Sequence, residues 1–132
     1  MTAGYSSTPL AKKLGIKAGG TVSVVKRNKG WEIPELPEGV VVQYSAKTSD
    51  VIVWFVRDKA EISAALTTAA PLIFPAASVW IAWPRKAGGH VSNVTENDIR
   101  NTALAMKLVD VKVAAIDHDW SGLKIVWRKE HR

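Results

Sequence analysis

The chain has 132 residues, a formal net charge of +6 and no cysteine. This length fits one domain, and a hydrophobic content of 47% with 23% charged residues excludes a wholly disordered chain. Without cysteine, disulfide bonds, thiol catalysis and thiolate metal sites are excluded. The apolar runs are too short to cross a membrane, and the first twenty residues lack the pattern of a secretory signal, so we expect a cytoplasmic location.

The excess positive charge is confined to the first thirty residues, which carry no acidic residue and six basic ones: Lys12, Lys13, Lys17, Lys26, Arg27 and Lys29. The remaining residues carry twelve basic and twelve acidic side chains. A local basic segment favours an anionic partner, although such runs are also common on solvated surfaces. The segment is short and contains only one aromatic residue, Tyr5, so we do not expect nucleic acid as the partner.

The first third of the chain predicts a short helix and two strands. The helix spans residues 10–14, with Pro9 before its first turn and Gly15 after its end. Residues 21–26 and 40–44 are rich in valine and predict strands. The glycine- and proline-rich connection between them is too short for a full helix.

Strands and helices alternate through the middle of the chain. Unbroken apolar runs at 51–56 and 77–83 predict strands that are covered on both faces. A helix that begins at Asp58 would bury a stripe of Ile62, Ala65, Leu66 and Ala69. Thr95 would cap a second helix, with Asp98 in the capping-box position. Its buried stripe would comprise Ile99, Ala103 and Met106.

The last third of the chain predicts an antiparallel hairpin. Residues 109–117 alternate, which places Val109, Val111, Val113 and Ala115 on one face. Residues 123–128 alternate again, which places Leu123, Ile125 and Trp127 together on one face. The link at 118–122 has five residues, too few for a parallel crossover.

These elements together predict an α/β fold. Alternating strands and helices give right-handed crossovers and a parallel sheet with helices on its faces. We therefore predict a single Rossmann-like, three-layer domain over residues 1–132. Its sheet would have about six strands, mostly parallel, with a C-terminal antiparallel hairpin. Residues 1–20 would form a basic arm with a short helix.

This layout resembles the class I methyltransferases, in which the last two strands also form an antiparallel pair at the sheet edge. The resemblance is topological and covers roughly residues 20–130. Two segments depart from that family's pattern. Its glycine-rich turn after the first strand is replaced by Lys26-Arg27-Asn28-Lys29-Gly30, and Val42-Gln43-Tyr44-Ser45 stands where an acidic residue ends the next strand. We therefore expect no S-adenosylmethionine and no other cofactor.

Three short segments carry a closer resemblance: Tyr5-Ser6 with Pro9-Leu10 and Lys13-Leu14-Gly15-Ile16, then Trp83-Pro84-Arg85-Lys86, then Asp117 with Trp120-Ser121-Gly122-Leu123. Across these three segments the chain resembles a family of small, mostly actinobacterial proteins that are described only by a domain of unknown function. The resemblance implies a bacterial origin and a Rossmann-like domain, and it implies no activity.

Basic residues follow the predicted ends of three parallel strands, where open α/β sheets bind ligands. Lys26 follows one strand, Arg57 a second, and Arg85 with Lys86 a third. Guanidinium and ammonium groups suit phosphate or carboxylate, and Trp83 could stack on a flat ring. We therefore predict that these five residues bind a small anionic ligand. The alternative is ordinary loop charges beside a core tryptophan.

The turn that contains Asp117, His118, Asp119 and Ser121 could be taken for a metal site or a hydrolytic triad. A metal site needs three or four ligands with outer-shell support, and a triad needs a defined three-dimensional relation. Asp side chains in such turns usually accept hydrogen bonds from nearby backbone. We therefore predict a structural hairpin turn, no metal and no catalytic residue.

Three functions remain open. The leading one is a non-enzymatic binding domain for a phosphate- or carboxylate-bearing ligand. The alternative is an interaction or assembly module in which the basic N-terminal segment and the edge hairpin contact a protein partner or a second copy. The second alternative is a divergent methyltransferase-like enzyme.

Overall fold

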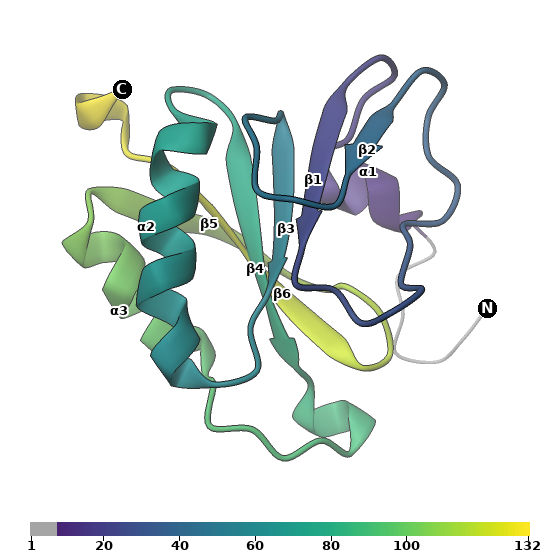
Figure 1. The fold of residues 1–132 in the computed structure, drawn as a ribbon. Coiled ribbons are helices and arrows are strands. Elements are labelled where there is room, and N and C mark those ends of the chain that lie inside the picture. The colour runs from purple at the N-terminus through teal and green to yellow at the C-terminus, as the bar shows by residue number, and fades with distance from the viewer. Residues whose placement is uncertain (1–7) are drawn as a thin grey trace.

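The computed structural model describes residues 8–132, which form one six-stranded sheet with the order β2-β1-β3-β4-β6-β5 (Figure 1). The strands are β1 (Thr21–Val25), β2 (Val41–Gln43), β3 (Val51–Phe55), β4 (Ser78–Pro84), β5 (Leu108–Ala115) and β6 (Trp120–Trp127). β1 to β4 are mutually parallel, and β6 is antiparallel to both β4 and β5. The predicted α/β sheet with a C-terminal antiparallel pair is confirmed. Tyr5 and Ser6 lie outside the described residues.

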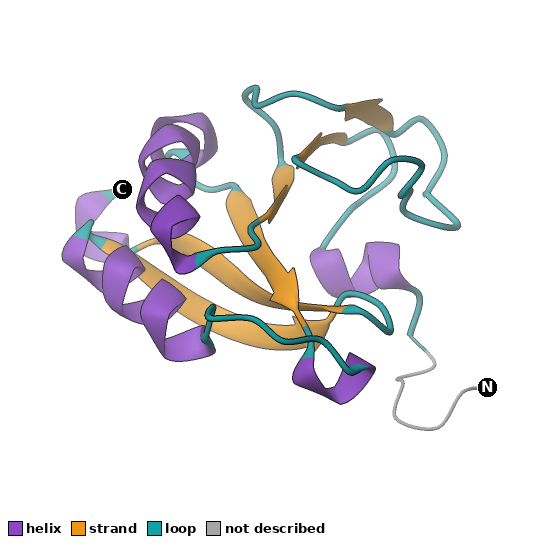
Figure 2. Ribbon diagram, turned by 60° about the horizontal axis from the view of Figure 1, so that its bottom comes forward, coloured by secondary structure: helices purple, strands orange, loops and turns teal. Residues whose placement is uncertain are grey.

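Helices cover both faces of this sheet (Figure 2). α2 (Ile62–Ile73) and α3 (Glu96–Ala105) lie on one face, and α1 (Leu10–Leu14) lies on the other with the long loop that joins β1 to β2. The described residues also contain three 3-10 turns: η1 (Lys59–Glu61), η2 (Lys86–Gly88) and η3 (Lys129–His131). The β1–β2 connection contains no helix, as its length predicts.

The core consists of two clusters, one on each face of the sheet. The cluster beneath α2 and α3 includes the predicted stripe of α2 together with Ile52, Ile81 and Ile125. Of the stripe predicted for α3, Ile99 and Ala103 belong to the cluster, whereas Met106 follows the end of the helix and packs against the cluster half-buried. The opposite cluster includes Trp80, Phe55 and Leu14 of α1. β3 and β4 contribute to both clusters because successive side chains of a strand point to opposite faces. Their unbroken apolar sequences therefore reflect coverage on both sides.

The two long helices begin where the sequence predicts. Asp58 accepts a hydrogen bond from the Ala60 backbone N–H at 2.8 Å, and η1 leads from this cap into α2. Thr95 and Asp98 form the predicted capping box at the start of α3. These bonds satisfy backbone donors that have no partner within the helix.

One prediction about β5 is wrong. Val109, Val111, Val113 and Ala115 do not share one face, because the register with β6 shifts between Asp110 and Lys112. Val109 pairs with Val126, whereas Val113 pairs with Leu123, so the two valines point to opposite faces. A β-bulge adds one unpaired residue and reverses the alternation beyond it.

None of the helices in the part of the chain that the structure describes is long and apolar enough to cross a bilayer.

Candidate functional site

The chain reverses its direction of winding at β1 and β3, which are neighbours in the sheet. From β1 the chain continues to β2 on one side, and it then returns to place β3 on the other side of β1. Open α/β sheets bind ligands beside the carboxyl ends of such a strand pair. Lys26 directly follows β1, and Arg57 lies two residues after the end of β3. Two predicted site residues therefore lie at this position.

The guanidinium group of Arg57 bridges the two strand ends. Its Nη1 donates to the backbone carbonyl of Lys26 at 2.8 Å, and its Nη2 donates to the Oδ1 of Asn28 at 2.6 Å. The same group lies over the ring of Trp120, 5.1 Å from its centroid. These contacts hold a cation between β1 and β3.

Lys26 and Arg57 border a cavity of about 400 Å³. The half-buried Trp54 forms part of its wall, and the small side chains of Ala60 in η1 and of Ala64 and Ala65 in α2 leave room beside the ring. Glu61 also lines the cavity, but its Oε1 accepts hydrogen bonds from the backbone N–H groups of Arg57 (2.7 Å) and Asp58 (3.3 Å). The cavity combines an aromatic wall with a cationic rim.

Lys26 adopts a left-handed backbone conformation, with φ of 63°. Glycine and asparagine adopt this conformation more readily than lysine. The turn after β1 therefore has the backbone shape that glycine supplies, but it carries a cation. Strained residues of this kind cluster at functional sites.

Arg27 is turned toward the end of β2. Its guanidinium lies 3.9 Å from the centroid of the Tyr44 ring, and its Nη1 donates to the carbonyl of Trp31 at 2.9 Å. Tyr44 lies in the segment where methyltransferases of this fold carry an acidic residue. A stacked cation and aromatic ring therefore lie at that strand end.

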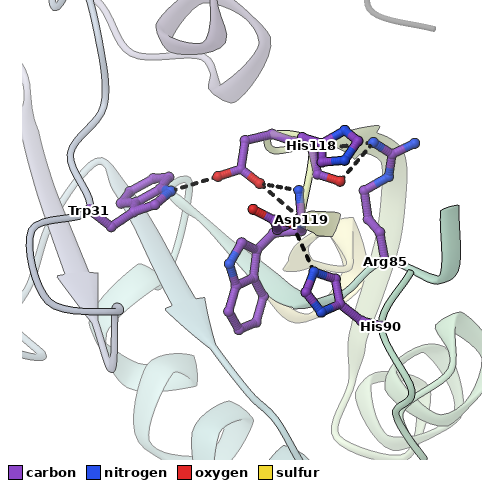
Figure 3. A network of polar contacts seen from close by, with 7 residues as sticks. Trp31, Arg85, His90, His118 and Asp119 are labelled. Carbon is purple, nitrogen blue, oxygen red and sulfur yellow. Dashed lines mark hydrogen bonds and ion pairs between the residues drawn. The ribbon is translucent and has the colours of Figure 1, made fainter. Parts of the chain in front are cut away.

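Arg85 holds the hairpin turn between β5 and β6 (Figure 3). Its Nη1 donates to the carbonyls of Asp117 and His118 at 3.2 and 3.3 Å. The Asp117 carboxylate accepts from the indole Nε1 of Trp31 at 2.9 Å and from the backbone N–H groups of Asp119 and Trp120. The predicted backbone bonds of this turn are present.

Trp83 and Lys86 border a separate cavity of about 270 Å³, together with Ser92 and Thr95. Trp83 is only 9% exposed and packs in the core beneath α2 and α3. The five predicted residues therefore divide into three places. Lys26 and Arg57 share one cavity, Trp83 and Lys86 share another, and Arg85 binds the hairpin turn.

Trp54 lies inside an apolar run, so the sequence pattern predicts a core residue there and no role in a site. Two features of the sequence could have indicated a site residue. Trp54 lies one residue before the end of β3, and small residues stand at the start of the next helix. Small side chains there leave part of the indole uncovered. Only the packing of α2 on the sheet shows which part is uncovered.

A third cavity, of about 310 Å³, lies beside Arg57 and is also lined by His90 and Asp119. The Nε2 of His90 lies 2.8 Å from Oδ1 of Asp119. This hydrogen bond lowers the pKa of Asp119, and the charges of His118 and Arg85 act in the same direction. Among residues 8–132, no three His, Asp or Glu side chains group as metal ligands would.

Comparison with known proteins places this chain in a family. Residues 36–129 match the model described as "Protein of unknown function (DUF3052)". The chain belongs to this family. No curated protein sequence matches the chain.

Solved structures share its fold at low sequence identity. A protein of the NADB-Rossmann superfamily from Streptococcus agalactiae has a TM-score of 0.56 and 10% identity, covering 96% of this chain and 71% of its own. A SAM-dependent methyltransferase from Aquifex aeolicus has a TM-score of 0.55 and 14% identity, covering 88% and 86%. Magnesium protoporphyrin IX methyltransferase from Synechocystis PCC 6803, with bound SAM, has a TM-score of 0.55 and 10% identity, covering 90% and 74%. These likenesses show that the DUF3052 domain is Rossmann-like.

Proposed function

We propose that this DUF3052 protein binds a small ligand in which a flat ring carries a phosphate or carboxylate group. The observation that carries the proposal is the shared cavity of Lys26 and Arg57 at the switch point between β1 and β3. The anionic group would contact the two cations, and the ring would lie against Trp54. Binding without catalysis is the expected activity.

The charge of the site supports an anion. Glu61 is the only acidic residue lining this cavity among residues 8–132, and its Oε1 already accepts two backbone N–H groups at the start of η1. Neither Lys26 nor Arg57 is in a salt bridge within the same residues. An incoming phosphate or carboxylate would therefore gain charge-assisted hydrogen bonds at this rim.

S-adenosylmethionine, which the fold family implies, does not fit these residues. The Arg57 guanidinium bridges the turn after β1 at the strand pair where this fold binds ligands. Arg27 stacks on Tyr44 at the end of β2, so a cation lies there as well. S-adenosylmethionine has a carboxylate, but its sulfonium and ammonium groups make it a net cation, which Lys26 and Arg57 would repel. We derive no methyl transfer for this protein.

Titration with matched anionic and neutral probes tests the proposal. AMP and phenyl phosphate combine a ring with a phosphate, whereas adenosine and phenol supply the ring alone. We expect the phosphates to bind more tightly than their neutral counterparts and to change the tryptophan fluorescence. Calorimetry gives the affinities.

Lys26→Asn is the decisive variant, because asparagine tolerates the left-handed conformation and removes the charge. We expect it to weaken phosphate binding about tenfold, which is typical of one lost charged hydrogen bond. Lys59→Gln is the matched control, since Lys59 is exposed and does not line the cavity. If no phosphate binds, or if Lys26→Asn binds AMP as the wild type does, the proposal is wrong.

A further inference from the structure

A larger cavity, of about 560 Å³, lies at the opposite end of the sheet. It is bordered by the amino ends of β1, β3 and β4, which lie toward the top of Figure 1. Thr21, Asp50 and Ser78 mark these three ends. The fold's usual ligand position is at the carboxyl ends, so neither the topology nor the family likeness predicts a site here.

Two lysines line the polar side of this cavity. Lys17 comes from the turn after α1, and Lys124 comes from β6. Lys124 also lies directly opposite Lys112 of β5, so both side chains project from the same face of the sheet. Among residues 8–132, none of these three lysines has a salt-bridge partner. Because like charges opposite each other are destabilising, an anion at this position would be favourable.

Asp50 is the acidic residue in the cavity, and its carboxylate is already engaged. Its Oδ2 accepts from the backbone N–H of Thr21 at 2.9 Å and from the Thr21 hydroxyl at 3.2 Å. The Asp50 backbone N–H donates back to the Thr21 hydroxyl at 3.1 Å. Asp50 thus ties the start of β3 to the start of β1, and the two lysines outnumber it.

The other side of the cavity is apolar. Leu72, Phe74, Pro75 and Ala76 line it from the end of α2 and the following turn, and Val126 lines it from β6. Phe74 is 50% exposed, and its ring meets that of Trp127 edge to face at 5.3 Å between centroids. The cavity therefore has one apolar wall, which includes an exposed aromatic side chain, and one cationic wall.

We infer that this cavity is a second binding site, independent of the site at Lys26 and Arg57, for a carboxylate attached to an apolar chain or ring. The carboxylate would contact the ammonium groups of Lys17 and Lys124. The apolar part would cover Phe74 and Leu72 and remove their surface from water. The volume is within the range of pockets that bury small ligands.

Octanoate is a suitable probe, with 1-octanol and acetate as controls for the chain and the charge. We expect octanoate to bind more tightly than either control in calorimetry. In heteronuclear NMR correlation spectra of the backbone amides, octanoate should shift the signals of Thr21, Asp50 and Ser78. Equal binding of octanol, no binding of octanoate, or shifts confined to the region of Lys26 and Arg57 would overturn the inference.

Variants separate the two sites. We expect Lys124→Gln and Lys17→Gln each to weaken octanoate binding about tenfold, the loss typical of one charged hydrogen bond. Phe74→Ala should also weaken it, and this exposed side chain can be shortened without opening the core. Lys26→Asn and the exposed Lys59→Gln should bind octanoate as the wild type does. Unchanged affinity in Lys124→Gln, or a loss in Lys26→Asn, would contradict an independent site.

Discussion

Gly122 in β6 is enclosed by the side chains around it. A Cβ atom at this position would lie 2.6 Å from Cδ1 of Ile116 and 3.1 Å from Cε3 of Trp80. Both neighbours are buried, Ile116 at 4% and Trp80 at 0% exposure. The sequence places Gly122 in the predicted link at 118–122, but in the structure it lies within β6. Its role is to let Ile116 and Trp80 approach the backbone.

We predict that Gly122→Ala lowers the free energy of unfolding by about 1–3 kcal/mol, the usual cost of overpacking a core. Urea denaturation followed by circular dichroism measures this change. The double variant Gly122→Ala with Ile116→Val lacks the Cδ1 atom that clashes, so it should recover part of the loss. A single variant as stable as the wild type would show that Ile116 moves aside without cost.

Lys26 and Arg57 show what residue-level reasoning can and cannot reach. Their positions after strand ends follow from the valine-rich and apolar runs that precede them. The bonds from Arg57 to the Lys26 carbonyl and to Asn28 join residues 29 to 31 positions apart, so local sequence could not reveal them. Trp83 illustrates the same limit, because its burial depends on where α2 and α3 pack.

At the scale of elements, three loops are joined at the carboxyl ends of the strands. The β1–β2 loop contributes Trp31, the segment after β4 contributes Arg85 and His90, and the β5–β6 turn contributes Asp117 and Asp119 (Figure 3). The joined side chains lie between 29 and 86 residues apart in sequence. This network positions the walls of the cavity beside Arg57.

The bond between His90 and Asp119 predicts a pH effect. The pKa of Asp119 lies below its ordinary 3.8, chiefly because of the hydrogen bond with His90. The folded state therefore favours the carboxylate, and the resulting stability is present above pH 3.8. It is lost as the pH falls through the lowered pKa.

We predict that His90→Ala raises the pKa of Asp119 toward its ordinary value. A carbon NMR titration of the side-chain carboxyl through the acid range measures this directly. In Asp119→Asn, the loss of stability on acidification should be smaller than in the wild type. An Asp119 pKa that is the same in His90→Ala and in the wild type would mean that the hydrogen bond is not formed in solution.

At the scale of the whole molecule, Trp80 connects the sheet to α1. It is fully buried on the face that α1 covers, and its indole Nε1 donates to the carbonyl of Leu14 at 3.2 Å. α1 has five residues and is too short to be stable alone. Its position therefore depends on this bond and on the packing of Ala11 and Leu14.

We predict that Trp80→Phe lowers the free energy of unfolding by about 2–4 kcal/mol, through the lost hydrogen bond and the smaller ring. Amide hydrogen exchange should accelerate most at Gly15 and Ile16, whose N–H groups bond to Lys12 and Ala11. Amides of β3 should keep more of their protection. Equal acceleration in α1 and β3 would show that α1 does not open separately from the sheet.

Local patterns in the sequence are sufficient to predict the order and kind of the elements. Apolar periodicity, capping residues and turn residues act over a few neighbouring positions, so they predict the strands, both long helices and the antiparallel hairpin. The departure at β5 has the same origin, because one unpaired residue reverses the alternation and periodicity alone does not reveal it.

The distribution of the cations over the molecule depends on the packing of the whole chain. The net charge of +6 arises from the first thirty residues, but the fold separates them. Lys26 lies at the carboxyl end of β1 beside Arg57, whereas Lys17 lies at the opposite end of the sheet beside Lys124. Strand pairing brings together residues that are far apart in sequence, and it sends neighbours in sequence to opposite ends of one strand. Each cavity is lined by residues from several elements, whereas a sequence pattern describes a single element. The pattern therefore does not show which cations share a cavity.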